Sequence, residues 1–185
     1  NAQSDLFHKD VPDEFIARVF AVMALTPRHT YQVLTKRHGR MRSLLRSDNF
    51  RPAVEDAMRG VVAAHRTERA WHKAWPLPNL WLGVSVEDQA TADLRIPALL
   101  DTPAAVRWVS AEPLLGPVDL RLTVAVNEDC RGCSGLLSPA HEPGNHWAPG
   151  EWHGVDWVVV GGESGPGARP MHPDWARTLR DQCQA

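Results

Sequence analysis

The sequence predicts an α/β fold in which parallel strands alternate with helices, in a sheet that is either open or closed into a barrel. Three short apolar runs indicate this, at residues 80–87, 106–112 and 157–164, and each ends at a serine near a glutamate. Strands buried on both faces read as near-continuous apolar runs, and stretches with helical periodicity separate these three. Strand and helix alternate at roughly 25 to 45 residues per unit, which is typical of a parallel sheet.

In the first third of the chain, one strand and three helices are expected. The first helix is expected to be capped by Asp10 and to have Pro12 in its first turn, because apolar residues recur at helical spacing as far as Met23. Thr26 and Pro27 should end it. A strand at residues 31–34 with a basic exit and helices at residues 41–45 and 52–67 follow.

The remaining elements repeat the same alternation. A helix is expected at residues 88–100, with Pro97 at a kink or a break. Strands at residues 106–110 and 156–160 and a helix from Pro173 complete the pattern. Residues 126–154 lack periodicity and are expected to be an insertion within a single domain that spans residues 1–185.

Composition and charge exclude several classes of protein. The 185 residues, 43% of them hydrophobic, are enough for one sizeable core. Twenty basic and 22 acidic residues give a net charge of −2, so nucleic-acid binding is not indicated by net charge. No apolar stretch reaches the roughly 20 residues that cross a bilayer, and three cysteines do not resemble a secreted disulfide framework. A cytoplasmic protein with no membrane partner is expected.

Both ends of the chain look cut. The opening residues 4–8 resemble the polar exit of a strand whose apolar body would come earlier. The closing residues 183–185 belong to a helical pattern without a stop signal. The chain is therefore expected to be a fragment.

Polar side chains follow five expected strands at the point where each strand ends. In parallel α/β folds, ligands and catalytic groups gather at the carboxyl ends of the strands. These residues are therefore expected to form a ligand site, although some of them could instead pair with one another at the rim. They are Ser4, Asp5, Thr35, Lys36, Arg37, Ser85, Glu87, Ser110, Glu112, Glu163 and Ser164.

Residues 161–169 form a glycine-rich segment directly after the last expected strand. Glycines permit a close approach of the backbone to a ligand, so a phosphate or a carboxylate could be held there with Arg169 closing over it. The alternative is a tight turn that leads into the helix from Pro173.

Four residues of the insertion have the side chains that bind zinc: Cys130, Cys133, His141 and His146. Their spacing approaches that of a compact zinc knuckle but matches no standard zinc finger closely. A small structural zinc site is one prediction, and a metal-free insertion is the other.

Five motifs together resemble a known family: SDLFH, QVLTKR, WLGVSVEDQ, VSAEPLLGP and VVGGESGPGARPM. They are similar to an uncharacterised family of bacteriophage and bacterial proteins, a three-cysteine-motif family related to radical S-adenosylmethionine (SAM) proteins. The resemblance covers nearly the whole chain except residues 126–154. It implies a partial (β/α)6 barrel in which Ser85, Glu87, Ser110, Glu112 and Glu163 line the side that binds SAM and substrate.

The resemblance also implies a [4Fe-4S] cluster, held in full-length members by a three-cysteine loop ahead of these motifs. Cys130 and Cys133 come too late in the sequence to replace that loop. SAM and the cluster are therefore expected for the full-length protein only, and this chain alone is expected to be inactive.

The leading hypothesis is a fragment of a radical-SAM-like enzyme of unknown substrate. Glu87 and Glu112 are expected to contact cationic or hydroxyl groups, with Glu163 as a third catalytic candidate. Lys36, Arg37 and Arg169 would contact carboxylate or phosphate, and Asp5, Thr35, Ser85, Ser110 and Ser164 would assist cofactor binding by hydrogen bonds.

Two alternatives come from other classes of protein. The first is a nucleic-acid or protein-binding module with a structural zinc knuckle and no catalysis. It would use a basic cluster made of Arg37, His38, Arg40, Arg42 and Arg46, which is otherwise a solvated helix face. The second is a metal-free hydrolase or lyase that uses the same carboxylates, which no nucleophile elbow or HExxH motif supports.

Overall fold

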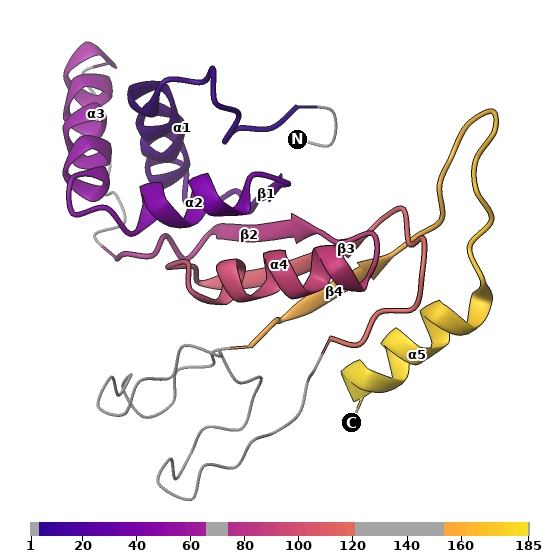
Figure 1. The fold of residues 1–185 in the computed structure, drawn as a ribbon. Coiled ribbons are helices and arrows are strands. Elements are labelled where there is room, and N and C mark those ends of the chain that lie inside the picture. Colours follow the sequence, from indigo (N-terminus) through magenta and orange to yellow (C-terminus); the bar gives the residue numbers. More distant parts are fainter. Residues whose placement is uncertain (1–3, 66–73, 121–153, 185) are drawn as a thin grey trace, which may run out of the picture. The chain divides into compact units, whose positions relative to one another are not determined.

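The computed structural model describes residues 4–65, 74–120 and 154–184, and their elements alternate as predicted (Figure 1). In order they are α1 (Asp13–Leu25), β1 (Tyr31–Thr35), α2 (His38–Leu45), α3 (Phe50–His65), β2 (Leu80–Ser85), α4 (Gln89–Leu100), β3 (Val106–Ala111), β4 (Trp157–Val160) and α5 (Pro173–Gln184). The strands form one four-stranded parallel sheet in the order β1-β2-β3-β4. This confirms the α/β class with parallel strands, whereas closure into a barrel stays a prediction.

The chain divides into two compact units. Unit 1 comprises residues 1–83 and 102–106, and unit 2 comprises residues 84–101 and 107–185. Each unit has its own buried apolar residues. The polar residues that follow β2, β3 and β4 all belong to unit 2.

Unit 1 is built on the packing of α1 against α3. The Phe20 ring is 1% exposed and meets the Phe50 ring edge to face, with 5.1 Å between ring centroids. Beyond the helix, the Asn79 Nδ2 amide donates to the carbonyl oxygens of Met23 and His29, each at 3.0 Å. These bonds fix the end of α1 to the chain on either side of β1.

The predicted cap of α1 is wrong. The N-cap position is held by Pro12 rather than Asp10, and no side chain caps the helix. The Pro12 carbonyl accepts the first helical bonds, from Phe15 N at 3.0 Å and Ile16 N at 3.2 Å. Asp10 is exposed. The acidic residues that favour this helix end lie in its first turn instead, at Asp13 and Glu14.

The burial of β2 and β3 confirms the prediction of strands buried on both faces, but the burial of β4 does not. Nearly every residue of β2 and β3 is buried. In β4, Trp157 is 40% exposed and the three valines are half-buried. β4 comes last in the strand order, so an apolar run there does not require burial on both faces.

Helix α4 begins with a strong cap and continues through its proline. Asp88 is the N-cap, and its carboxylate accepts from Thr91 N at 2.8 Å in a capping box. The helix does not break at Pro97, because it extends to Leu100 and Asp101 N donates to Pro97 O at 3.0 Å. Pro97 has no backbone N–H, so α4 forfeits one hydrogen bond there without ending.

Candidate functional site

The carboxyl ends of β2, β3 and β4 lie side by side in unit 2. Val86 N donates to Ser110 O at 2.8 Å, and Gly161 N donates to Ala111 O at 3.1 Å. In the parallel hydrogen-bonding pattern, these bonds place Ser85 beside Ser110, and Glu112 beside both Glu87 and Gly161. Residues paired in this way point to the same face of the sheet. The three predicted strand exits of unit 2 are therefore brought together.

The segment after β3 is hydrogen-bonded to the carboxyl ends of both β2 and β4. Leu115 N donates to Glu87 O at 2.8 Å, and Leu114 N donates to Gly161 O at 2.9 Å. One turn of chain therefore links the exits of β2 and β4. This fixes the backbone on both sides of Glu112.

Two buried serines form the inner layer of this edge. Ser85 is 4% exposed and Ser110 is 3% exposed. The Ser110 hydroxyl lies 3.3 Å from Glu112 Oε2 and donates to it. Ser110 is therefore placed to orient the Glu112 carboxylate.

The Glu112 side chain lies across the backbone of β4 at Gly161. A Cβ atom built on Gly161 would lie only 2.3 Å from Glu112 Oε1, so glycine is required for this placement. Glu112 is exposed, and it makes no ion pair within residues 4–65, 74–120 and 154–184. Its negative charge faces solvent at the shared edge of three strands.

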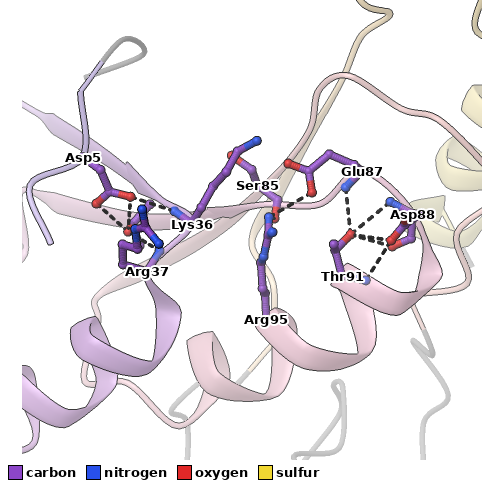
Figure 2. A network of polar contacts seen from close by, with 9 residues as sticks. Asp5, Lys36, Arg37, Ser85, Glu87, Asp88, Thr91 and Arg95 are labelled. Atoms are coloured by element: carbon purple, nitrogen blue, oxygen red, sulfur yellow. Dashed lines mark hydrogen bonds and ion pairs between the residues drawn. The ribbon is translucent and has the colours of Figure 1, made fainter. Parts of the chain in front are cut away.

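Glu87, in contrast, is held by an arginine that the sequence did not single out. Arg95 Nη1 of α4 donates to Glu87 Oε2 at 2.9 Å and to the Ser85 carbonyl at 2.8 Å (Figure 2). The two side chains are 13% and 15% exposed. Thr91 Oγ1 accepts from Glu87 N at 3.0 Å, which joins the residue to the first turn of α4. For Glu87, therefore, the alternative holds in which a polar residue at the strand ends pairs with another side chain instead of a ligand.

The hydrogen bonds of the α4 cap also lower the pKa of the Asp88 carboxyl. Bonds donated by Thr91, from its backbone N–H and its hydroxyl, hold the pKa of Asp88 below its ordinary value. Asp88 therefore stays ionised beside the strand exit at neutral pH.

Glu163 is paired with Arg169 across the glycine-rich segment. Glu163 Oε2 accepts from Arg169 N and Arg169 Nε, each at 2.8 Å, and Oε1 accepts from Nη2 at 2.6 Å. These bonds lower the pKa of Glu163 to about 2 and raise the pKa of Arg169. Arg169 therefore closes over a residue of its own loop. Ser164 in the same loop is exposed.

Asp5 accepts hydrogen bonds from Thr35 and Lys36, two other predicted cofactor-binding residues of unit 1; Figure 2 labels Asp5 and Lys36. The Asp5 carboxylate accepts from Thr35 Oγ1 at 2.7 Å, from Lys36 N at 3.0 Å and from Phe7 N at 2.9 Å. Thr35 is 2% exposed. Asp5 and Thr35 thus join the opening segment to the end of β1, and the exposed Lys36 side chain follows them.

The basic cluster of the alternative hypothesis is partly engaged inside unit 1. Arg40 donates to His8 O, to Val11 O at 2.6 Å and to Asp13 Oδ1 at 2.5 Å. These bonds hold the turn ahead of α1. Arg40 therefore has a structural role, and the side chains of Arg42, on α2, and Arg46, at its C-cap, are exposed.

The predicted zinc ligands Cys130, Cys133, His141 and His146 lie outside the described residues. Inside the described ranges, no group of three His, Cys, Asp or Glu residues is placed to hold a metal ion. The described ranges contain one cysteine, Cys183 of α5, and burial raises the pKa of its thiol. This part of the chain does not provide the three thiolates of a [4Fe-4S] cluster.

Comparison with known proteins identifies the family. The described helices are too short or too polar to cross a membrane. No curated protein and no solved structure matches the chain. The family described as "Protein of unknown function (DUF5131)" matches residues 1–185, the whole length of the sequence. The chain therefore belongs to the DUF5131 family.

Proposed function

We propose that the protein is part of a radical-SAM-like enzyme and that the carboxyl edge of β2, β3 and β4 binds SAM and a polar substrate. The observation that carries the proposal is the placement of Glu112. This carboxylate lies at the meeting point of three strand ends and makes no ion pair within the described residues. Such an edge is where parallel α/β folds bind their ligands.

The chemistry of the residues at this edge fits SAM. SAM has an ammonium group and a sulfonium centre, and the uncompensated charge of Glu112 suits either cation. Ser110 supports the Glu112 carboxylate by its hydrogen bond at 3.3 Å. Bound SAM would supply the reactive adenosyl and methyl carbons, while the protein binds it, orients it and limits access of water.

Glu87 and Glu163 have other roles in this proposal. Each already accepts hydrogen bonds from an arginine, Arg95 and Arg169 respectively. Glu87 is therefore a positioning residue that fixes the exit of β2. No step is assigned to an iron–sulfur cluster, because the described residues contain one thiol.

Calorimetric titration of the purified chain with SAM tests the proposal. We expect saturable binding, and we expect Glu112→Gln to weaken it by about ten- to hundred-fold, the effect of losing a hydrogen bond to a charged group. Glu55→Gln is the matched control, because Glu55 pairs with Arg51 on the surface of α3. Absence of SAM binding by the unaltered chain would overturn the proposal, and equal losses in both variants would remove the role of Glu112.

A further inference from the structure

We propose that the loop from Gly161 to Arg169 is a binding site for the carboxylate group of a small-molecule ligand, and that Glu163 closes this site until the ligand displaces it. The proposal concerns a different set of side chains from the Glu112 site. It holds whether or not the chain binds SAM.

The first observation is the convergence of three donors on one carboxylate. The backbone N–H, Nε and Nη2 of Arg169 all donate to Glu163, at 2.8, 2.8 and 2.6 Å. A guanidinium fork that engages both oxygens matches the planar geometry of a carboxylate. The loop therefore already holds a carboxylate, which is that of its own residue Glu163.

The second observation is that the loop fixes one of these donors, the backbone N–H of Arg169, independently of Glu163. Ala168 N donates to Gly165 O at 3.2 Å, which forms a turn directly before Arg169. Gly165 and Gly167 adopt positive φ angles of 100° and 79°, a backbone shape that other residues rarely adopt. The N–H of Arg169 is therefore held in place by the backbone of the loop.

The third observation is that the closing carboxylate can be exchanged at low cost. The Glu163 side chain is 28% exposed and the Arg169 side chain is 62% exposed, so water reaches both partners. Exposed ion pairs contribute little to stability. A ligand carboxylate that reproduces the same three bonds could therefore displace Glu163.

The position of the loop also favours a ligand. It starts at Gly161, directly after β4 and against the Glu112 side chain. Ligands of parallel α/β folds bind at this end of the strands. A carboxylate held by Arg169 would thus belong to a molecule that lies along the same edge of unit 2.

Titration with acetate, followed by the backbone and Nε–H NMR signals of Arg169, tests this inference. Sodium chloride at matched ionic strength is the reference. In Glu163→Ala, we expect the Arg169 signals to saturate at an acetate concentration about two- to sixfold lower than in the unaltered chain, as expected for removing a weak internal competitor. In Arg169→Gln, the response of the loop should disappear.

Asp181→Ala is the matched control. Asp181 Oδ1 accepts from Arg180 Nε at 2.8 Å and from Nη2 at 2.5 Å, so this variant frees an exposed guanidinium that has no converging backbone N–H. If the Arg169 signals of Glu163→Ala saturate at a lower acetate concentration than the Arg180 signals of Asp181→Ala, the result supports the proposal. Equal saturation concentrations would mean that acetate binds any exposed guanidinium, which overturns the proposal. Neither result depends on SAM.

Discussion

Gly161 leaves the space that the Glu112 carboxylate occupies, since a Cβ atom on Gly161 would lie 2.3 Å from Glu112 Oε1 and 3.0 Å from its Cδ. Backbone bonds fix both residues. Gly161 N donates to Ala111 O, and Gly161 O accepts from Leu114 N. The carboxylate therefore cannot keep its place if residue 161 gains a side chain.

We expect Gly161→Ala to displace the Glu112 carboxylate without unfolding the protein. Only the end of a flexible side chain must move, so the thermal midpoint should change little, whereas SAM affinity should fall as in Glu112→Gln. Calorimetry and thermal unfolding measure the two effects.

The control for this substitution is Gly162→Ala, whose new Cβ atom would lie in ordinary contact with Met171 Cβ at 3.5 Å. Gly162→Ala should leave SAM affinity unchanged. If both alanine variants bind SAM like the unaltered chain, the space at Gly161 does not position Glu112.

The Arg95–Glu87 ion pair should matter strongly for stability. Removing one partner of a buried pair leaves an uncompensated charge, at a cost of about 3 kcal/mol or more. We expect Arg95→Met to lower the free energy of unfolding by about 3 kcal/mol. Adding Glu87→Gln should recover much of that loss. Urea denaturation of both single variants and the double variant measures the coupling.

The surface pair Arg51–Glu55 gives the reference for this cycle, since these side chains are 51% and 36% exposed. Arg51→Met should cost less than about 1 kcal/mol. A comparable cost for Arg95→Met would show that the pair at the exit of β2 is no more than a surface contact.

The cap of α4 should make stability depend on pH. The folded-state pKa of Asp88 is below its ordinary value of 3.8, so its ionisation stabilises the fold above that value, and the contribution is lost as pH falls through the lower folded-state pKa. Asp88→Ala should therefore cost about 1 kcal/mol at pH 7 and progressively less below pH 3.8.

Asp88→Asn separates the charge from the hydrogen bond, because asparagine caps a helix with an oxygen that does not titrate. Urea denaturation from pH 7 downward should show this variant losing less stability than the unaltered chain as Asp88 protonates. Identical pH profiles for the two proteins would contradict the assignment.

Glu163 should titrate far below an ordinary glutamate. Its bonds from Arg169 lower its pKa to about 2 from 4.5, and Arg169→Gln should return it toward 4.5. A side-chain carboxyl NMR titration reads both values directly. A midpoint near 4 for Glu163 in the unaltered chain would show that the loop is open in solution.

The strands and the shared edge could be predicted because burial on two faces leaves a readable pattern. The runs at β2 and β3 are apolar apart from Arg107 and the serines near their ends, and in both runs a glutamate follows two residues after the serine. Residues that leave adjacent parallel strands at equal spacing must meet at one edge. Ser85 and Ser110 are therefore neighbours in space as the sequence predicted.

The partners of the acidic residues could not be predicted in the same way. Arg95 lies on α4 close to the exposed residues Asp93 and Leu94, so its sequence position does not distinguish it from a solvated residue. Asp10 and Pro12 both suit a helix start, and the structure places Pro12 at the N-cap. Because Glu87 precedes the first residue of α4, no helical spacing in the sequence links it to Arg95.

The two indoles at the other end of β3 and β4 offer a way to observe the folding of unit 2. Trp108 and Trp157 are register partners, and their rings lie 5.5 Å apart with an interplanar angle of 30°. Far apart in the sequence, they come this close only when the two strands pair. Their electronic coupling should give a circular dichroism band in the near ultraviolet that Trp157→Phe removes, an optical signal for the assembly of the sheet that needs no added label.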